Sequence, residues 1–233
     1  MDTNYFEFRG VSPEFYDDYQ IPIFIRSRIP KTASILDFGC GFGQLLNALR
    51  NDGYKSVAGV DITPAAVSHC QSIGIQIFDS LDAVISDGTK FDWIVMSHVL
   101  EHIDKDAIIL LLNRIRTELL RPDGKFMIMV PNAMSNTDCY WRYEDWTHTL
   151  LFTPGSLLYV LRAAGFTSIH FIDPDCTEGS CWYNLIAKKM GLTLYRANRA
   201  FWNRITASSY HKPSPQIFSF ELKAVASSPL LQD

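Results

Sequence analysis

The stretch Ser34-Ile-Leu-Asp-Phe-Gly-Cys-Gly-Phe-Gly43 decides the fold of this chain of 233 residues. A short apolar run that ends in closely spaced glycines is typical of a buried parallel strand. Residues 44–50 follow as a predicted helix with leucines on one side. A glycine loop between a strand and a helix lets a ligand approach the backbone, and the helix N-terminus adds partial positive charge. The stretch therefore predicts a ligand-binding turn.

Six more runs repeat the strand pattern along the chain, with helical patterns between them. We expect strands at residues 56–61, 75–78, 91–96, 125–130, 167–172 and 216–226. Together with the strand at 34–39, they predict an α/β fold with a doubly wound, seven-stranded and mostly parallel sheet.

Local signals predict where helices and turns begin. Thr63-Pro64 and Thr153-Pro154 each place a capping hydroxyl before a proline at the first helical position. Asp104 is expected to cap a long helix whose apolar residues recur at helical spacing: Ile108, Leu111, Leu112, Ile115 and Leu119. Arg121-Pro-Asp-Gly124 is typical of a turn.

The composition excludes several classes of protein. A chain that is 47% hydrophobic and 13% aromatic is not disordered. No apolar run approaches ~18 residues, so we expect no transmembrane helix. The net charge of −4 gives no global electrostatic reason to bind nucleic acid. Five scattered cysteines argue against a disulfide framework or a zinc site, so we expect a cytoplasmic protein with no metal in its site.

Two segments interrupt the alternation of strands and helices. Residues 131–152 form a polar and aromatic loop whose length is typical of lids and binding loops. Residues 181–215 predict a helical insertion before the last strand, and the chain has no Asp or Glu from Gly179 through Phe220. This basic segment is either a solvated insertion or a contact, through 188–212, with phosphate, an anionic sugar or a membrane surface.

Asp61 supplies a second ligand-binding signal. It ends the second predicted strand about 20 residues after the glycine loop, where an acid can accept ribose hydroxyls. A dinucleotide fingerprint would place its third glycine where this chain has Gln44, which disfavours a nicotinamide dehydrogenase.

The order of four runs resembles class I S-adenosylmethionine-dependent methyltransferases over residues 31–173. The runs are I-L-D-x-G-C-G-x-G, V-x-G-V-D, F-D-x-I-V-x-x-H-V-L-E-H and L-R-P-D-G. Pro131-Asn132, Arg142-Tyr143-x-Asp145-x-Thr147-His148 and Phe152-Thr153-Pro154 resemble a subgroup associated with bacterial O-antigen and other surface-polysaccharide biosynthesis.

The resemblance implies one methyltransferase domain over residues 1–233, with a Rossmann-like fold and S-adenosylmethionine as cofactor. Its expected parts are an N-terminal lid or helix at 1–30, a cofactor-binding core at 31–130, an acceptor loop at 131–152 and the basic insertion at 181–215.

The resemblance also implies which residues hold the cofactor. The glycine loop would contact the methionine part through Asp37, Gly39, Gly41 and Gly43. Asp61 would take the ribose hydroxyls and Ile62 the adenine, with Asp79 or Ser80 near the adenine amino group. Ser97 and His98 would lie under the sulfonium. Aromatic rings at Tyr5, Tyr16 or Tyr19 could face this cation, and Tyr19 is the one we select.

The acceptor is expected to be a hydroxyl of a saccharide or of a nucleotide-linked sugar. A base would help such a weak nucleophile, and histidine suits that role. His148 is the first candidate, as base or acceptor ligand, and His98 is the second. Predicted acceptor contacts come from the same loop: Arg142, Tyr143, Asp145, Trp146 and His148. The aromatic rings of Trp141, Tyr143 and Trp146 in this loop either stack on a sugar or seal the loop over the core.

Three alternatives remain open. The chain could methylate an oxygen or nitrogen of a small molecule in another pathway, or bind the cofactor without turnover. RNA is a weaker candidate, because only residues 188–212 offer a basic face. The Asn/Asp-Pro-Pro run typical of amino-directed enzymes is replaced by Met96-Ser-His-Val99, and Ser97 and His98 make a poor site for a hard cation.

Overall fold

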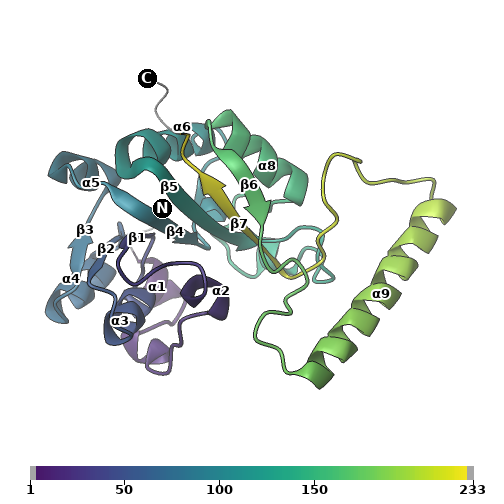
Figure 1. The fold of residues 1–233 in the computed structure, drawn as a ribbon, viewed down its shortest axis with the longest axis horizontal. Helices are drawn as coiled ribbons and strands as arrows, with labels where there is room; N and C mark the ends of the chain where they lie inside the picture. The colour runs from purple at the N-terminus through teal and green to yellow at the C-terminus, as the bar shows by residue number, and fades with distance from the viewer. Residues whose placement is uncertain (1–3, 230–233) are drawn as a thin grey trace.

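The fold is built on one seven-stranded sheet (Figure 1). The computed structural model describes residues 4–229. The strands are β1 (Ser34–Phe38), β2 (Ser56–Val60), β3 (Gln76–Phe78), β4 (Phe91–Ser97), β5 (Leu120–Pro131), β6 (Thr167–Phe171) and β7 (Glu221–Ser227). Their order is β3-β2-β1-β4-β5-β7-β6, with β1 to β5 parallel and β7 antiparallel to both of its neighbours. The predicted α/β fold with a mostly parallel sheet is confirmed.

Helices cover both faces of the sheet. The α-helices are α1 (Tyr5–Phe8), α2 (Ile23–Arg26), α3 (Gln44–Asn51), α4 (Pro64–Ser72), α5 (Leu81–Asp87), α6 (Ile108–Arg114), α7 (Tyr140–Tyr143), α8 (Pro154–Ala163) and α9 (Trp182–Ile205). Single-turn 3₁₀ segments are η1 (Pro13–Tyr16) and η2 (Leu100–His102), and η3 (Ile115–Leu119) is a π-helical turn.

Alternating strand residues divide the core into two layers. Leu36 and Ile94 point to the face covered by α6 and α8, while their neighbours Ile35 and Val95 point to the face covered by α2 and α3 (Figure 1). This alternation is the period-two pattern of side chains along a strand, and burial on both faces explains why the strands read as continuous apolar runs.

Four local predictions differ from the structure. Thr63 is the N-cap of α4, but its hydroxyl makes no capping hydrogen bond, whereas Thr153 caps α8 as expected. The helix expected after Asp104 begins at Ile108, because residues 104–107 close a turn in which the Ala107 N–H donates to the Asp104 carbonyl at 2.9 Å. The segment 121–124 is a bulge inside β5, since pairing with β4 breaks off at Leu120 and resumes at Lys125. The last strand starts at Glu221 rather than at residue 216.

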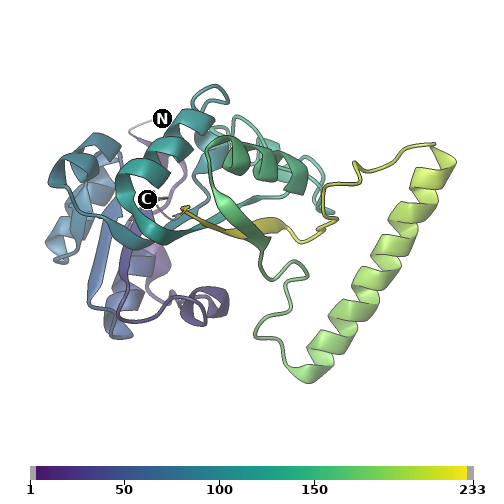
Figure 2. The same ribbon diagram turned by 45° about the horizontal axis from the view of Figure 1, so that its top comes forward.

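Helix α9 stands away from the sheet (Figures 1 and 2). Along the chain, α9 follows β6 and precedes β7, which confirms a helical insertion before the last strand. Over the described residues 4–229, no helix has the length and apolar character needed to cross a membrane.

Candidate active site

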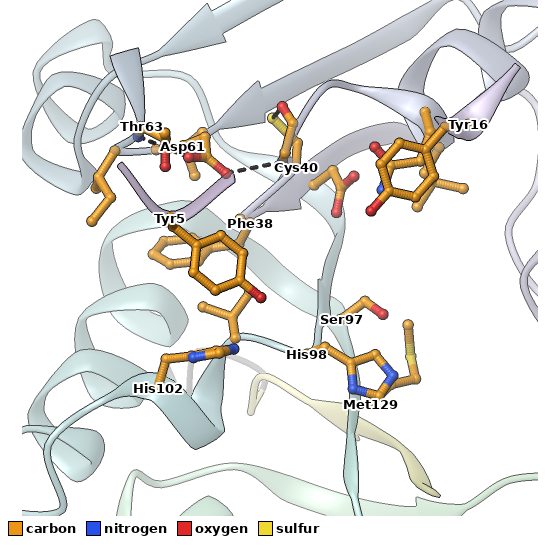
Figure 3. Close-up of a pocket in the computed structure, with 18 of the residues that line it drawn as sticks. Tyr5, Tyr16, Phe38, Cys40, Asp61, Thr63, Ser97, His98, His102 and Met129 are labelled. Carbon is orange, nitrogen blue, oxygen red and sulfur yellow. Dashed lines mark hydrogen bonds between the residues drawn. The ribbon is translucent and has the colours of Figure 1, made fainter. Parts of the chain in front are cut away.

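A cavity of about 780 Å³ lies at the carboxyl ends of β1, β2 and β4 (Figure 3). Ligands of open α/β sheets bind at this edge, where the strand order reverses. The loop after β1, the residues that follow β2 and the residues that follow β4 form its floor, and the N-terminal segment forms one wall. The predicted contacts that line it are Asp37, Gly39, Gly41, Asp61, Ile62, Ser97, His98 and Tyr19.

The glycine loop requires glycine at two positions, of which only the first faces the cavity. Gly39 has φ of 80°, in the left-handed region, and a Cβ there would lie 2.3 Å from Val99 Cγ2. Gly43 has φ of 77°, but a Cβ on it would meet Cys70 Sγ at 2.8 Å, inside the protein. Gly43 therefore allows the start of α3 to pack closely against α4, which carries Cys70, and it does not line the cavity.

Two carboxylates lie on the cavity floor. Asp61 accepts the Gly41 N–H at 2.9 Å and the Thr63 N–H at 2.8 Å, so it joins the glycine loop to the start of α4 (Figure 3). Burial, together with the nearby Asp61 carboxylate, raises the pKa of Asp37 to about 7. A cation or a hydroxyl-rich ligand would stabilise this pair of acids.

The N-terminal segment supplies an aromatic wall to the cavity. Tyr5, Phe6, Tyr16 and Tyr19 all line it. Phe6 also packs against Phe42, with ring centroids 4.4 Å apart. The first three residues of the predicted lid at 1–30 lie outside the described residues. The described part brings electron-rich rings to the place where the resemblance puts a sulfonium.

His98 follows β4 in a left-handed conformation, with φ of 54°. Its Nδ1 lies 3.2 Å from Glu101 Oε1 and its Nε2 lies 3.1 Å from Glu221 Oε2. Burial alone would lower the pKa of His98, but these two carboxylates outweigh it and raise the pKa to about 10. Both ring nitrogens of His98 face carboxylates, so neither presents a free lone pair to an acceptor hydroxyl in this arrangement, and the role of His98 stays a prediction.

A second cavity of about 280 Å³ adjoins the first. The two share Tyr5, His98 and His102 in their walls. The remaining wall of the second cavity consists mainly of polar and aromatic residues: Arg9, Pro131, Trp141, Glu144, Asp145, His148 and Phe220.

The loop 131–152 is fixed to the end of β4. The Thr149 N–H donates to the Glu101 carbonyl at 2.8 Å. Burial alone would raise the pKa of Asp145, but hydrogen bonds from Thr147 and Tyr5 outweigh it and lower the pKa to about 2. Asp145 therefore serves as an anchor, because Tyr5 O–H donates to it at 2.8 Å and Thr147 O–H at 2.6 Å.

The other residues predicted from this loop divide into two groups. His148 is buried and lines the second cavity. Arg142 donates to the His148 carbonyl, so its guanidinium holds the loop together. Tyr143 and Trp146 are exposed and are absent from both cavity walls, with Trp146 at 94% of its full exposure.

Asp79 and Ser80 also lie outside the cavity walls. Ser80 is the N-cap of α5 and accepts the Ala83 N–H at 3.2 Å, and its own hydroxyl donates to Asp79. The next residue, Leu81, lines the large cavity instead.

Several site residues were missed by the sequence analysis. Glu101 lies within the H-V-L-E-H run, where its place beside two histidines was the available signal. Glu221 and Arg9 carried no local signal, because β7 and the N-terminal segment reach the site only in the folded chain. Glu144 lies in the predicted acceptor loop beside the residues chosen there. Of the three aromatic residues considered in that loop, Trp141 is the one that lines the second cavity.

The residues present fit S-adenosylmethionine. The cavity is large enough for a nucleoside with an amino-acid chain, since ligand sites commonly span about 300–1,000 Å³. Asp61 would hold the ribose hydroxyls, Ile62 would cover the adenine, and the glycine backbone and Asp37 would hold the methionine part. A doubly wound sheet with this site defines the class of S-adenosylmethionine-dependent methyltransferases.

Comparison with known proteins agrees with this class. The family model described as "Methyltransferase domain" matches residues 18–171, and the chain belongs to this family. S-adenosylmethionine is the cofactor of the domain.

Two curated relatives and one solved structure illustrate the similarity. Cyclopropane-fatty-acyl-phospholipid synthase of Escherichia coli K12 is 26% identical over 201 residues, which cover 82% of this chain and 48% of the relative. A ubiquinone biosynthesis O-methyltransferase of Xylella fastidiosa is 30% identical over 118 residues, which cover 47% of this chain and 46% of the relative. The chain spans about half the length of these relatives. The crystal structure of an S-adenosylmethionine-dependent methyltransferase from Archaeoglobus fulgidus shares the fold, with TM-score 0.60, 21% identity and coverage of 95% and 96%.

Proposed function

We propose that this domain transfers a methyl group from S-adenosylmethionine to a hydroxyl of a saccharide or nucleotide-linked sugar in surface-polysaccharide biosynthesis, in the cytoplasm. The observation that carries the proposal is the junction of two cavities at Tyr5, His98 and His102. Bound in the large cavity, the cofactor supplies an activated methyl group, and the smaller cavity then holds the acceptor beside it. Holding two reactants in contact accounts for much of the barrier reduction in such transfers.

The lining of the smaller cavity supports a hydroxyl-bearing acceptor. Arg9, Glu144 and Asp145 bring hydrogen-bonding groups, and Trp141 brings an aromatic ring. A sugar presents hydroxyls at its rim and an apolar face, so this mixture of groups suits it. His148 is the residue we assign to the acceptor oxygen, because it is buried in this wall and its ring is 4.6 Å from that of His102.

A second candidate is the hydroxyl of a non-sugar small molecule. The O-methyltransferase of Xylella fastidiosa that this chain resembles is named for ubiquinone biosynthesis, which favours a small-molecule acceptor. Both candidates use the same junction and differ in what fills the smaller cavity.

The test measures S-adenosylhomocysteine release by the full chain against two acceptor panels, nucleotide-linked sugars and catechol-type phenols. The proposal expects release with a sugar acceptor, and His148→Asn is expected to lower kcat at least ~100-fold while cofactor affinity stays unchanged. His170→Asn is the matched control, since His170 is exposed on β6. Release with phenols alone would replace the sugar by the second candidate.

A further inference from the structure

Three side chains at the cavity junction form a compact cluster. Glu101 and His102 lie in η2, and His148 lies in the loop 131–152. One nitrogen or oxygen of each lies within 4.8 Å of the others, and His148 Nε2 is 4.0 Å from Glu101 Oε1. The Glu101 side chain is fully buried, and its Oε2 has no hydrogen-bond partner in the described part of the chain. A buried carboxylate oxygen without a partner is costly, so it requires an explanation.

The hydrogen bonds of the two histidines fix which ring nitrogen is free. His148 Nδ1 faces the Trp141 carbonyl, which only accepts, so Nδ1 carries the proton. His102 Nδ1 lies 2.8 Å from Thr147 Oγ1, and Thr147 already donates its proton to Asp145 at 2.6 Å. Nδ1 of His102 is therefore also a donor, which leaves a lone pair on Nε2 of both rings.

We propose that Glu101, His102 and His148 bind one divalent first-row transition-metal ion, such as zinc, with an open coordination position toward the smaller cavity. Two imidazoles and a carboxylate are a suitable donor set for such an ion. Metal-binding histidines usually donate their second ring nitrogen to a carbonyl or to a polar chain ending in a carboxylate, as both do here. From the sequence we expected no metal, because the cysteines form no zinc-binding pattern and Ser97 and His98 make a poor site for a hard cation.

The spacing needs only a small adjustment to hold an ion. Bonds of about 2.0–2.2 Å place the donor atoms of a tetrahedral ion about 3.3–3.6 Å apart. The separation of 4.0 Å between His148 Nε2 and Glu101 Oε1 exceeds that value by about half an ångström, which the two side chains would close on binding the ion. The role of the ion rests on the proposed function. With its Nε2 bound to the ion, His148 acts on the acceptor through the metal and does not accept the hydroxyl proton itself. The open coordination position would then hold the acceptor oxygen.

The test is metal binding by the full chain, freed of any affinity tag and treated with a chelator. Titration with Co²⁺ followed by visible absorption, and with Zn²⁺ by calorimetry, should show one site per chain. His148→Asn and His102→Asn keep a side-chain N–H near the position of Nδ1 while removing Nε2, and Glu101→Gln keeps the side-chain shape. Each should weaken metal binding at least ~100-fold.

The controls separate metal binding from folding and from activity. His170→Asn should bind the metal like the wild type, and all variants should bind S-adenosylhomocysteine and unfold cooperatively. Absence of stoichiometric binding by the wild type, or equal binding by the three variants, would overturn the site. Methyl transfer without metal binding would leave the proposed function standing, and metal binding without transfer would contradict that function alone.

Helix α9 carries a second and independent inference. Its half-buried residues recur on one side: Leu185, Leu192, Tyr195, Arg199 and Asn203. On this side Tyr195 packs against Phe218, and Arg199 donates to the Tyr210 hydroxyl at 2.7 Å. The opposite side presents large apolar side chains that are each at least half exposed: Trp182, Tyr183, Ile186, Met190, Leu194, Phe201 and Ile205. Within the described residues, none of α9 is buried. An apolar stripe of this length exceeds what surfaces normally expose.

The charges around the stripe favour one occupant. The segment from Gly179 through Phe220 contains basic residues and no acids. An anionic surface would attract these basic side chains, whereas a second copy of α9 brings no acidic residue to pair with them. Amphipathic helices with apolar and aromatic residues on one face and Lys or Arg beside it lie in the headgroup region of membranes. We infer that α9 docks on the surface of anionic phospholipid membranes.

Vesicle co-sedimentation tests this inference. The full chain should bind vesicles of phosphatidylglycerol and phosphatidylcholine at least tenfold more tightly than vesicles of phosphatidylcholine alone. Ile186→Ser combined with Leu194→Ser should abolish binding, and Lys189→Gln combined with Arg204→Gln should weaken it. Tyr159→Ser is the control, because Tyr159 is an exposed ring on α8. Binding that is unchanged in both double variants, or a stable dimer that hides α9, would overturn the inference.

Discussion

Asp61 accepts the backbone N–H of Gly41 at 2.9 Å, so the residue assigned to the ribose also holds the glycine loop in place. Its second oxygen accepts the Thr63 N–H at the start of α4. The carboxylate therefore organises the cofactor cavity before any ligand enters.

Asp61→Asn should lower the stability of the ligand-free protein. An amide offers one acceptor oxygen where the carboxylate offers two, so either the Gly41 or the Thr63 N–H loses its partner. The expected loss in free energy of unfolding is about 1–3 kcal/mol. Urea unfolding followed by circular dichroism measures it, with Asp79→Asn as the control at an exposed position. A stability equal to the wild type would show that the loop holds its shape without Asp61.

Asp37→Asn should stabilise the ligand-free protein at high pH. Burial raises the pKa of Asp37 to about 7, so the folded state binds a proton that the unfolded state releases near pH 4. The wild type therefore loses stability as the pH rises from about 4 to 7, and the variant lacks this loss. Urea unfolding at pH 5 and pH 8 should show a variant advantage that grows by a few kcal/mol between the two pH values, because most of the proton release falls between them. A wild type whose stability rises over this range relative to the variant would contradict the assignment.

Gly39→Ala should cost more stability than the same change at another left-handed glycine. Gly39 and Gly88 have φ of 80° and 76°, but only at Gly39 does a new Cβ meet another atom, Val99 Cγ2 at 2.3 Å. The backbone strain costs about 1–2 kcal/mol in both variants, and the clash adds to it at Gly39. Thermal unfolding compares the two, and equal losses would mean that Val99 moves aside freely.

Tyr5→Phe should weaken acceptor binding and leave cofactor binding nearly unchanged. The Tyr5 hydroxyl donates to Asp145 at 2.8 Å, which ties the N-terminal segment to the acceptor loop. Its loss removes a hydrogen bond to a charged group, worth about 1.5–3 kcal/mol, and should raise KM for the acceptor at least tenfold. Tyr16→Phe is the control, since Tyr16 lines only the cofactor cavity. A change confined to cofactor affinity would argue against a role at the junction.

The parts of the site that were predictable are local in sequence. The strand–glycine–helix stretch and Asp61 were found because each places a ligand group at the end of an apolar run. The fold was predictable because apolar strand patterns alternate with helical patterns along the chain. Gly43 and Ser80 fit the motif by position, but their roles in the structure differ. Gly43 packs against Cys70, and Ser80 caps α5.

The unpredictable parts depend on contacts between distant segments. Glu221 meets His98 across 123 residues of sequence, because β7 pairs with β5 in the antiparallel direction. Arg142 was a plausible anion ligand in sequence, yet the chain turns back so that its guanidinium meets the His148 carbonyl. Such partners are set by the folded loop, which hydrophobic periodicity does not describe.

The most direct test of the central claim is calorimetric titration with S-adenosylhomocysteine. The wild type should bind one equivalent with micromolar affinity, and Asp61→Ala should bind at least ~100-fold more weakly, while His170→Asn behaves like the wild type. Absence of binding to the folded wild type, or equal binding by Asp61→Ala, would contradict a cofactor site built on the glycine loop and Asp61.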